Sequence, residues 1–385
     1  MASAEVLDFA RLLAPIAGEN PAGRDLRTDF SPKSAYREIR DARRKAADAE
    51  RSLLLRGGVD DQGQPVASPD WRPVLQLAPK VLAEQSKDLE IAALWIEALV
   101  RKHGFAGLRD GFRLIRELVE QFWDRLYPLP DEDGMRTRVY PLVALNGEES
   151  DGVLAGPIQR VPITSSRATG EFSVFDYRQA LELDSLQDPD ARARRMEQPG
   201  VVTLQTFQKS VGETSPAVFK TVLDDLDQCR EEFRRLSEVL EEKCGQDESG
   251  HSAAPPTSSV LGALDSVRED FVRIAGPVLG LGAEGEASGE ERDGSGAGPG
   301  DELGNVSARI RSREEAFRTL LRVAEFFKRT EPHSPIAYAL EQAVRWGRMS
   351  LPQLLQELIP EEVTRQQLFK LVGIVPDRGS QGDTA

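Results

Sequence analysis

The chain has 385 residues, 39% hydrophobic and 29% charged, and this length is enough for two or three globular domains. Its 49 Lys and Arg against 64 Asp and Glu give a formal net charge of −15, which argues against a protein dedicated to binding nucleic acid. Two cysteines, Cys229 and Cys244, cannot form a disulfide framework and lack metal-site spacing. The sequence has no apolar run of about 18 residues and no secretory signal, so we expect a cytoplasmic protein without a membrane span.

Helical patterns fill most of the first 180 residues. Ser31 and Pro32 are typical of the N-cap and first turn of a helix. Residues 88–104 and 107–127 are strongly apolar and are joined by only about three residues, so we expect an antiparallel pair of core helices. Further on, residues 158–164 and 171–175 are rich in β-formers and flank a polar turn, which predicts one small β-hairpin.

The clearest pattern in the chain lies between residues 219 and 240. Seven apolar residues alternate three and four positions apart and form a heptad seam: Phe219, Val222, Leu226, Cys229, Phe233, Leu236 and Leu240. Such a seam is buried against a partner helix, which belongs either to the same chain or to another one.

A glycine-rich, acidic stretch separates this region from the C-terminus. Residues 276–304 hold 10 of the 32 glycines, and residues 284–302 carry seven acids against one arginine. Because this composition cannot bury enough apolar surface to offset its ordering entropy, we expect a disordered linker. Proline, serine and glycine positions beyond it predict about four short helices. The expected all-α, multi-domain organisation is an N-terminal helical domain (1–180), a helical middle region (200–281), the linker (282–301) and a small C-terminal helical domain (302–376).

The sequence offers little catalytic chemistry. Its three histidines, His103, His251 and His333, lie far apart in different predicted segments, which favours neither a catalytic triad nor a zinc site. No phosphate-binding loop, dinucleotide fingerprint, nucleophile elbow or zinc-protease motif occurs. We therefore expect no catalytic residue, no cofactor and no metal, in a protein that is not an enzyme. The alternative is a hydrolase that uses acidic residues, for which the sequence nominates no residue.

Three blocks of the sequence resemble the TssA (ImpA) family of the bacterial type VI secretion system. The first is the pattern P-I-x-G-x-N-P-A-G-x-D-L-R at Pro15–Arg27, and the second is F-W-D-x-L-Y-P-L at Phe122–Leu129. The third is the block EPHSPI at residues 331–336, which is similar to the C-terminal domain of the shorter kind of TssA. The first two blocks resemble the ImpA N-terminal domain.

The resemblance implies a non-enzymatic assembly factor of a contractile injection machine. Members of the family engage baseplate and membrane-complex components and assist polymerisation of tube and sheath. They form homo-oligomeric rings through the C-terminal domain. The implied location is cytoplasmic, at the inner face of the inner membrane, in a baseplate-associated role, with no nucleic acid partner and no direct membrane span.

Two groups of residues are the candidate interaction sites. The N-terminal signature loop, which either shapes the fold or contacts a partner, contains Asn20, Pro21, Gly23 and Arg24. The expected subunit interface of the C-terminal domain contains Tyr338, Arg345, Trp346 and Arg348. The alternative function is a helical adaptor or regulator that forms no ring and binds a single partner through the helix at 219–240.

Overall fold

The structure is a computed structural model, and the chain forms two compact units, Met1–Glu290 and Glu291–Ala385. Each unit is described by itself. The described residues are 1–31, 34–57, 64–65, 67–148, 152–198, 200–246, 250–281, 313–330, 335–349, 354–355 and 357.

Helices make up the regular structure of the described residues, which contain no β-strand, so the all-α prediction is confirmed. The first unit contains α1 (Phe9–Leu13), the 3-10 helix η1 (Leu26–Thr28), α2 (Ala35–Arg56), α3 (Arg72–Glu84), α4 (Leu89–Phe122), the 3-10 helix η2 (Trp123–Arg125), α5 (Met135–Asn146), α6 (Ala155–Gln159), α7 (Val174–Ser185), α8 (Pro189–Met196), α9 (Leu204–Glu213), α10 (Pro216–Cys244) and α11 (Ser258–Leu279). The second unit contains α12 (Arg313–Thr330) and α13 (Ile336–Arg348).

The segment α4 is an antiparallel pair of helices. At Gly104 the backbone leaves the helical region, with φ 58° and ψ −139°, and the chain turns back. A Cβ added at Gly107 would lie 2.5 Å from the carbonyl oxygen of Leu99, and one added at Gly111 would lie 2.5 Å from Cγ1 of Ile96. In a straight helix Leu99 and Gly107 would be about 12 Å apart. The predicted antiparallel pair is therefore confirmed, and the missing side chains of two glycines let its halves touch.

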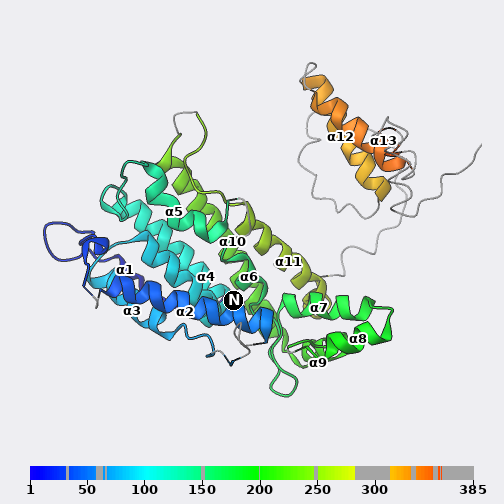
Figure 1. Cartoon of the computed structure of the whole chain (residues 1–385), viewed down its shortest axis with the longest axis horizontal. Coiled ribbons are helices and arrows are strands. Elements are labelled where there is room, and N and C mark those ends of the chain that lie inside the picture. The colour runs from blue at the N-terminus through cyan, green and yellow to red at the C-terminus, as the bar shows by residue number, and fades with distance from the viewer. Residues whose placement is uncertain are drawn as a thin grey trace, which may run out of the picture. The chain divides into compact units, whose positions relative to one another are not determined.

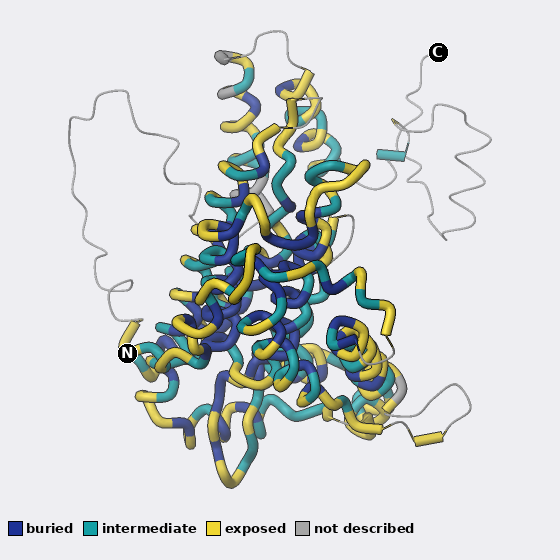
Figure 2. The backbone as a smooth tube through the Cα atoms, turned by 90° about the vertical axis from the view of Figure 1, so that its left-hand side faces the viewer, coloured by how far each residue is buried: buried dark blue, intermediate teal, exposed yellow. Residues whose placement is uncertain are grey.

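The pair of helices in α4 is the centre of the first unit. Figure 1 shows α2 and α3 on one side of α4, and α10 and α11 on the other. Figure 2 shows the buried residues concentrated along the middle of this bundle. One continuous core extends from Leu7 to Ala275 and joins the residues of the expected N-terminal domain to those of the expected middle region.

The heptad seam of α10 is part of this core. All its members except the half-buried Val222 are buried. The rings of Phe112 in α4 and Phe233 in α10 lie 4.7 Å apart, and Phe219 meets Phe271 of α11 at 6.0 Å. The partner helices of the seam are therefore in the same chain.

The structure does not confirm the small β-hairpin predicted at residues 158–175, because no strand forms there. Ile158 is the penultimate residue of helix α6, and Val174 begins α7. Between these helices the chain makes only two isolated antiparallel bridges, Pro162–Ser173 and Ser166–Gly170. The second predicted run, 171–175, is cut short because Ser173 and Asp176 form a reciprocal capping box that starts α7 at Val174.

The second unit has α12 and α13 packed against each other through Ala324, Ala337 and Val344, which are buried. Gly347 lies against the ring of Phe317, since an added Cβ would be 2.5 Å from its Cζ. Helix α13 confirms the helix predicted after Ser334 and Pro335. The expected linker at 282–301 and most residues beyond 349 lie outside the described residues.

Replacing Gly107 by Ala should destabilise the first unit, because the added methyl group meets a backbone oxygen that cannot rotate away. We expect the free energy of unfolding to fall by about 1–3 kcal/mol, although Ala is the better helix former. Urea denaturation followed by circular dichroism measures this change. The matched control is Gly262→Ala in α11, where nothing lies within 4 Å, and it should be neutral or stabilising. Equal effects of the two substitutions would contradict the proposed close contact.

Candidate functional site

The two N-terminal sequence motifs meet at the segment that precedes α4. The backbone N–H of Arg24 donates to the carbonyl of Gln85 (3.1 Å), and that of Lys87 donates to the carbonyl of Ala22 (2.8 Å). On the other side, the N–H of Tyr127 donates to the carbonyl of Lys87 (3.0 Å). Residues 85–88 therefore join the loop of the first motif to the F-W-D-x-L-Y-P-L motif.

Asn20 and Pro21 stabilise the signature loop from within. The Oδ1 of Asn20 accepts from the N–H of Ala22 (3.1 Å), and its Nδ2 donates to the hydroxyl of Tyr127 (3.3 Å). The carbonyl of Pro21 accepts from the N–H of Ile16 (2.9 Å). Both residues are half-buried, so their contacts within the chain explain their place in the motif.

Gly23 and Arg24 differ in their surroundings. Gly23 has φ 79°, and an added Cβ would lie 2.1 Å from the carbonyl oxygen of Gln85, so the position requires glycine on two grounds. Arg24 is exposed. Among the four signature residues, Arg24 is therefore the one whose side chain is available to a partner.

Lys87 is a fully buried lysine at the centre of this junction, with 0% of its surface exposed. Its Nζ donates to the carbonyls of Leu12 (2.6 Å) and Leu82 (2.8 Å), in the last turns of α1 and α3, and lies 5.5 Å from the centre of the Phe122 ring. A cation is favourable at the C-terminal end of a helix, where carbonyls lack partners. Burial lowers the pKa of Lys87 to about 8.

Lys87 binds carbonyl groups at helix ends, whereas Asp88 binds N–H groups at the start of α4. Its Oδ1 accepts from the backbone N–H groups of Glu90 (2.8 Å) and Ile91 (3.2 Å), which is an N-cap. Its Oδ2 accepts from Nη1 of Arg27 (2.6 Å), whose Nη2 donates to Glu90 (2.8 Å). Burial alone would lower the pKa of Arg27, but the Asp88 carboxylate outweighs it and raises that pKa.

Sequence reasoning missed Lys87 and Asp88 as central residues. The N-cap was readable, because an Asp directly before a long apolar helix is a start signal. Nothing in the pattern distinguishes Lys87 from a surface lysine, since its burial depends on α1 and α3.

The four residues expected at the subunit interface lie on α13. Tyr338, Arg345 and Arg348 are exposed, and Trp346 is half-buried. The indole N–H of Trp346 donates to Oε1 of Glu357 (3.1 Å). Arg345 and Arg348 line a shallow hollow of the second unit. The helix thus brings these side chains to the surface.

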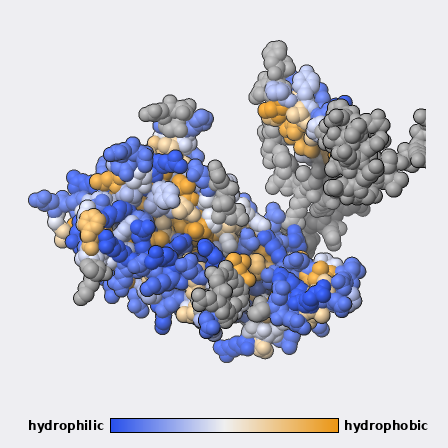
Figure 3. Space-filling view, in the orientation of Figure 1, coloured by the Kyte–Doolittle hydropathy of each residue, from blue (hydrophilic) through white to orange (hydrophobic). Residues whose placement is uncertain are grey.

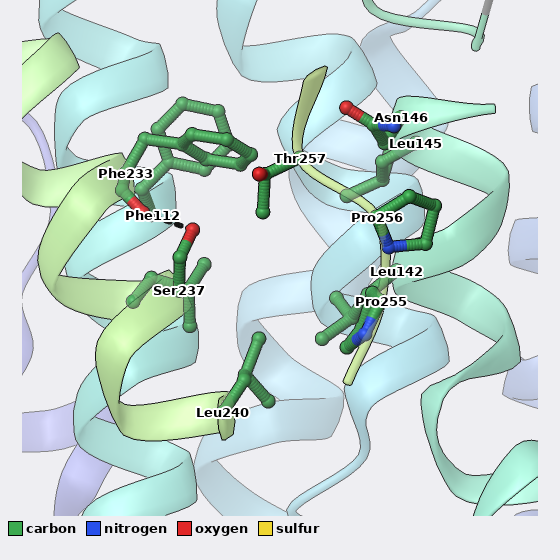
Figure 4. A pocket seen from close by; sticks show the side chains of 11 residues that line it. Phe112, Leu142, Leu145, Asn146, Phe233, Ser237, Leu240, Pro255, Pro256 and Thr257 are labelled. Atoms are coloured by element: carbon green, nitrogen blue, oxygen red, sulfur yellow. Dashed lines mark hydrogen bonds between the residues drawn. The ribbon is translucent and has the colours of Figure 1, made fainter. Parts of the chain in front are cut away.

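A small apolar cavity lies in the first unit between α4, α5 and α10, closed by residues 255–257 (Figure 4). Its volume is about 20 Å³, and apolar side chains form most of its wall. The hydroxyl of Ser237 donates to the carbonyl of Phe233 (2.9 Å), and Oδ1 of Asn146 accepts from the N–H of Val260 (2.9 Å). With these polar groups engaged, the cavity has the character of a packing defect and not of a ligand site.

Within the described ranges, no cluster of three or more His, Cys, Asp or Glu side chains is arranged to hold a metal ion. The same residues include no helix that is long and apolar enough to cross a membrane. Figure 3 shows that the visible face of the first unit is mainly hydrophilic, with smaller apolar patches.

Gly23→Ala and Gly18→Ala form a matched pair in the signature loop. Both glycines have positive φ, 79° and 127°, but only Gly23 faces a backbone oxygen, while nothing lies within 4 Å of a Cβ at Gly18. Gly23→Ala should lower the free energy of unfolding by about 1–3 kcal/mol more than Gly18→Ala. Thermal or urea unfolding measures this difference. Similar losses of stability at both sites would contradict the role of the Gln85 contact and would assign the loss to backbone strain alone.

Lys87 should make the stability of the first unit depend on pH. Between pH 8 and its ordinary pKa of 10.5, the unfolded chain binds a proton that the folded chain does not, so its contribution to stability rises with pH. The rise should total about 3 kcal/mol, and Lys87→Met should remove it. Urea unfolding between pH 7.5 and 10.5 measures the difference. The control is Lys80→Met at an exposed lysine of α3, and identical profiles of the two variants would contradict the assignment.

Comparison with known proteins gives consistent matches. A family model described as ImpA, N-terminal, type VI secretion system, matches residues 13–147, which include both motifs that meet at Lys87. The chain is 28% identical over 365 residues to the type VI secretion system component TssA1 of Pseudomonas aeruginosa, an alignment that covers 95% of this chain and 98% of that protein.

A solved structure agrees with these sequence matches. It is the N-terminal domain, including the conserved ImpA_N region, of the TssA component of the type VI secretion system from Burkholderia cenocepacia. It matches with a TM-score of 0.57 and 26% identity, and covers 71% of this chain and 95% of that chain. Residues 13–147 therefore match the ImpA N-terminal region, and the chain as a whole is similar to TssA components of type VI secretion systems.

Proposed function

We propose that this chain is a non-enzymatic structural component that takes part in assembling a bacterial type VI secretion system. The observation that carries the proposal is the alignment with TssA1, which extends over 95% of this chain and 98% of the relative and so includes both compact units. A likeness restricted to the N-terminal domain would support only a shared module. The location that fits this role is the cytoplasm, at the inner face of the inner membrane.

The second unit is proposed to form a homo-oligomeric ring. In α12 and α13, only Ala324, Ala337 and Val344 are buried among the described apolar residues, whereas Leu321 and Tyr338 are exposed. Exposed apolar side chains are typical of association surfaces. The expected interface residues are those that α13 presents: Tyr338, Arg345, Trp346 and Arg348.

The first unit is proposed to contact other components of the machine, namely baseplate, tube, sheath and membrane-complex proteins. Its signature loop is rigid, because hydrogen bonds to Gln85 and Tyr127 fix its conformation, and it presents the exposed Arg24. A baseplate-associated role is favoured over a distal cap of the sheath, because the block at residues 331–336 resembles the shorter kind of TssA.

The alternative of an adaptor that uses the helix at 219–240 has no support from the structure. The apolar face on which it depended is buried against α4 and α11 in the same chain. Exposing that face would require unfolding the core of the first unit.

Replacement of Tyr338 by Asp tests the ring. Light scattering on the full chain should give a mass many times the 42.5 kDa of one copy, and Tyr338→Asp should lower it, because a charge in an apolar interface must be desolvated. The control is Tyr140→Asp on α5 of the first unit, where the tyrosine is as exposed, at 64% against 63%. Circular dichroism verifies that both variants remain helical.

The same pair of variants can be introduced into a bacterium whose type VI secretion depends on this chain. Tyr338→Asp should abolish secretion, while Tyr140→Asp should preserve it unless α5 contacts a partner. A full-length chain that is monomeric at high concentration would refute the ring, and normal secretion without the chain would refute the assembly role.

A further inference from the structure

Residues 3–6 of the first unit lie in a site built from three buried charged side chains. Arg109 and Asp110 come from the second half of α4, and Asp225 comes from α10. Their exposed fractions are 7%, 1% and 5%. Charged groups are buried to this extent only where they are paired and hydrogen-bonded. Residues 3–6 supply part of the hydrogen bonds that these three side chains need.

The two carboxylates bind N–H and O–H groups of this segment. Asp225 accepts from the backbone N–H of Ser3 through Oδ1 (2.8 Å) and from the Ser3 hydroxyl through Oδ2 (2.6 Å). Oδ2 of Asp110 accepts from the backbone N–H of Val6 (2.6 Å). Hydrogen bonds to charged groups are the stronger class, so each of these contacts is worth more than an ordinary backbone bond.

Arg109 binds the carbonyls of the same segment. Its Nη1 donates to the carbonyl of Ser3 (3.0 Å) and to Asp225 (3.0 Å), and its Nη2 donates to the carbonyl of Ala4 (3.2 Å). Nε of Arg109 donates to Asp110 (2.8 Å). The site therefore recognises mainly the main chain of a short peptide. Two side chains of the segment add contacts: Ser3 binds Asp225, and the carboxylate of Glu5 accepts from Nη1 of Arg113 (2.6 Å).

The apolar residues that follow continue this attachment. Leu7, Phe9 and Leu12 are buried in the core, and the carbonyl of Leu12 accepts from Lys87. We call residues 3–13 the arm. The arm is thus bound to the helical bundle in two ways: its first residues form main-chain hydrogen bonds, and its later residues bury apolar side chains.

The connection from the arm to the rest of the chain is weakly held. All of residues 14–19 are described, and they are exposed except for the half-buried Ile16. One hydrogen bond, from the N–H of Ile16 to the carbonyl of Pro21 (2.9 Å), ties them to the body. Fully extended, these six residues span about 20 Å, which sets how far the arm can move from the body of its own chain.

We propose that the arm site also binds the arm of a second copy of this chain, so that neighbouring copies exchange arms in the assembled state. The contacts of an exchanged arm are the same as those of the chain's own arm, so the two states differ only in the path of residues 14–19. Neighbours held in a homo-oligomer present their arms at a high effective concentration, which makes exchange competitive. This inference rests on the homo-oligomer proposed above.

Crosslinking between two differently tagged full-length chains tests the exchange. One chain carries Ala4→Cys, the other Gln228→Cys, and a short bismaleimide joins them. Arg109 contacts both positions, at the Ala4 carbonyl (3.2 Å) and at Oε1 of Gln228 (3.3 Å), and both residues are exposed. Cys229 and Cys244 are buried, and burial raises the pKa of both thiols, so they should not compete.

After the two chains are unfolded together and refolded, we expect a crosslinked species of twice the chain mass that carries both tags. A single chain with both substitutions should crosslink within itself and verifies that the positions are within reach. Replacing Gln228→Cys by Arg234→Cys, an exposed position elsewhere on α10, measures chance encounters. Adding Asp225→Asn to the Gln228→Cys chain should reduce the two-tag species, because the Ser3 contacts lose a charged acceptor.

Light scattering on the same mixture separates the possible failures. An oligomer without the two-tag species would overturn arm exchange and leave the ring intact. A two-tag species that is equally abundant with Arg234→Cys would also overturn it. A monomeric mixture would overturn both proposals. An oligomer with a two-tag species that depends on Gln228→Cys and on Asp225 would establish the exchange.

Discussion

The hydrogen bonds donated by the buried amino group of Lys87 are the contact around which the first unit is arranged. They satisfy carbonyls at the ends of α1 and α3, while the next residue, Asp88, satisfies N–H groups at the start of α4. Two adjacent residues of opposite charge thus connect the ends of three helices. Since the main chain of the same segment also bonds Ala22 and Tyr127, the two sequence motifs of the family serve one structural junction.

Ion pairs extend this principle from the junction to the whole bundle. Arg43 of α2 binds the buried Glu97 of α4 (2.8 Å), and Arg101 of α4 binds Glu50 of α2 (2.6 Å). Arg109 joins α4 to α10 through Asp225 (3.0 Å). Buried pairs of this kind contribute less net stability than apolar packing would, but removing one partner is costly. They fix which helices are neighbours.

The proposed interaction surfaces draw on residues other than the main apolar seam of the first unit. The seam of α10, the small cavity beside Phe112 and the two cysteines all belong to the core. Among the described residues, the segments proposed for interaction are the exposed edge of the signature loop, the face of α13 and the arm at residues 3–13. Each of these is a short segment presented by rigid helices, which is how an assembly component can have several weak contacts without a large interface.

The sequence by itself determined the helices, because their apolar residues recur at a spacing that one helix face requires, as in the seam from Phe219 to Leu240. It also determined the reversal at Gly104. Only the tertiary structure decided that the seam packs within the chain, that residues 158–175 pair through isolated bridges and not through strands, and that Lys87 and Asp225 are buried. The physical reason is that burial of a charge is a property of segments distant in the chain that enclose it, and periodicity records only which face of one element avoids water.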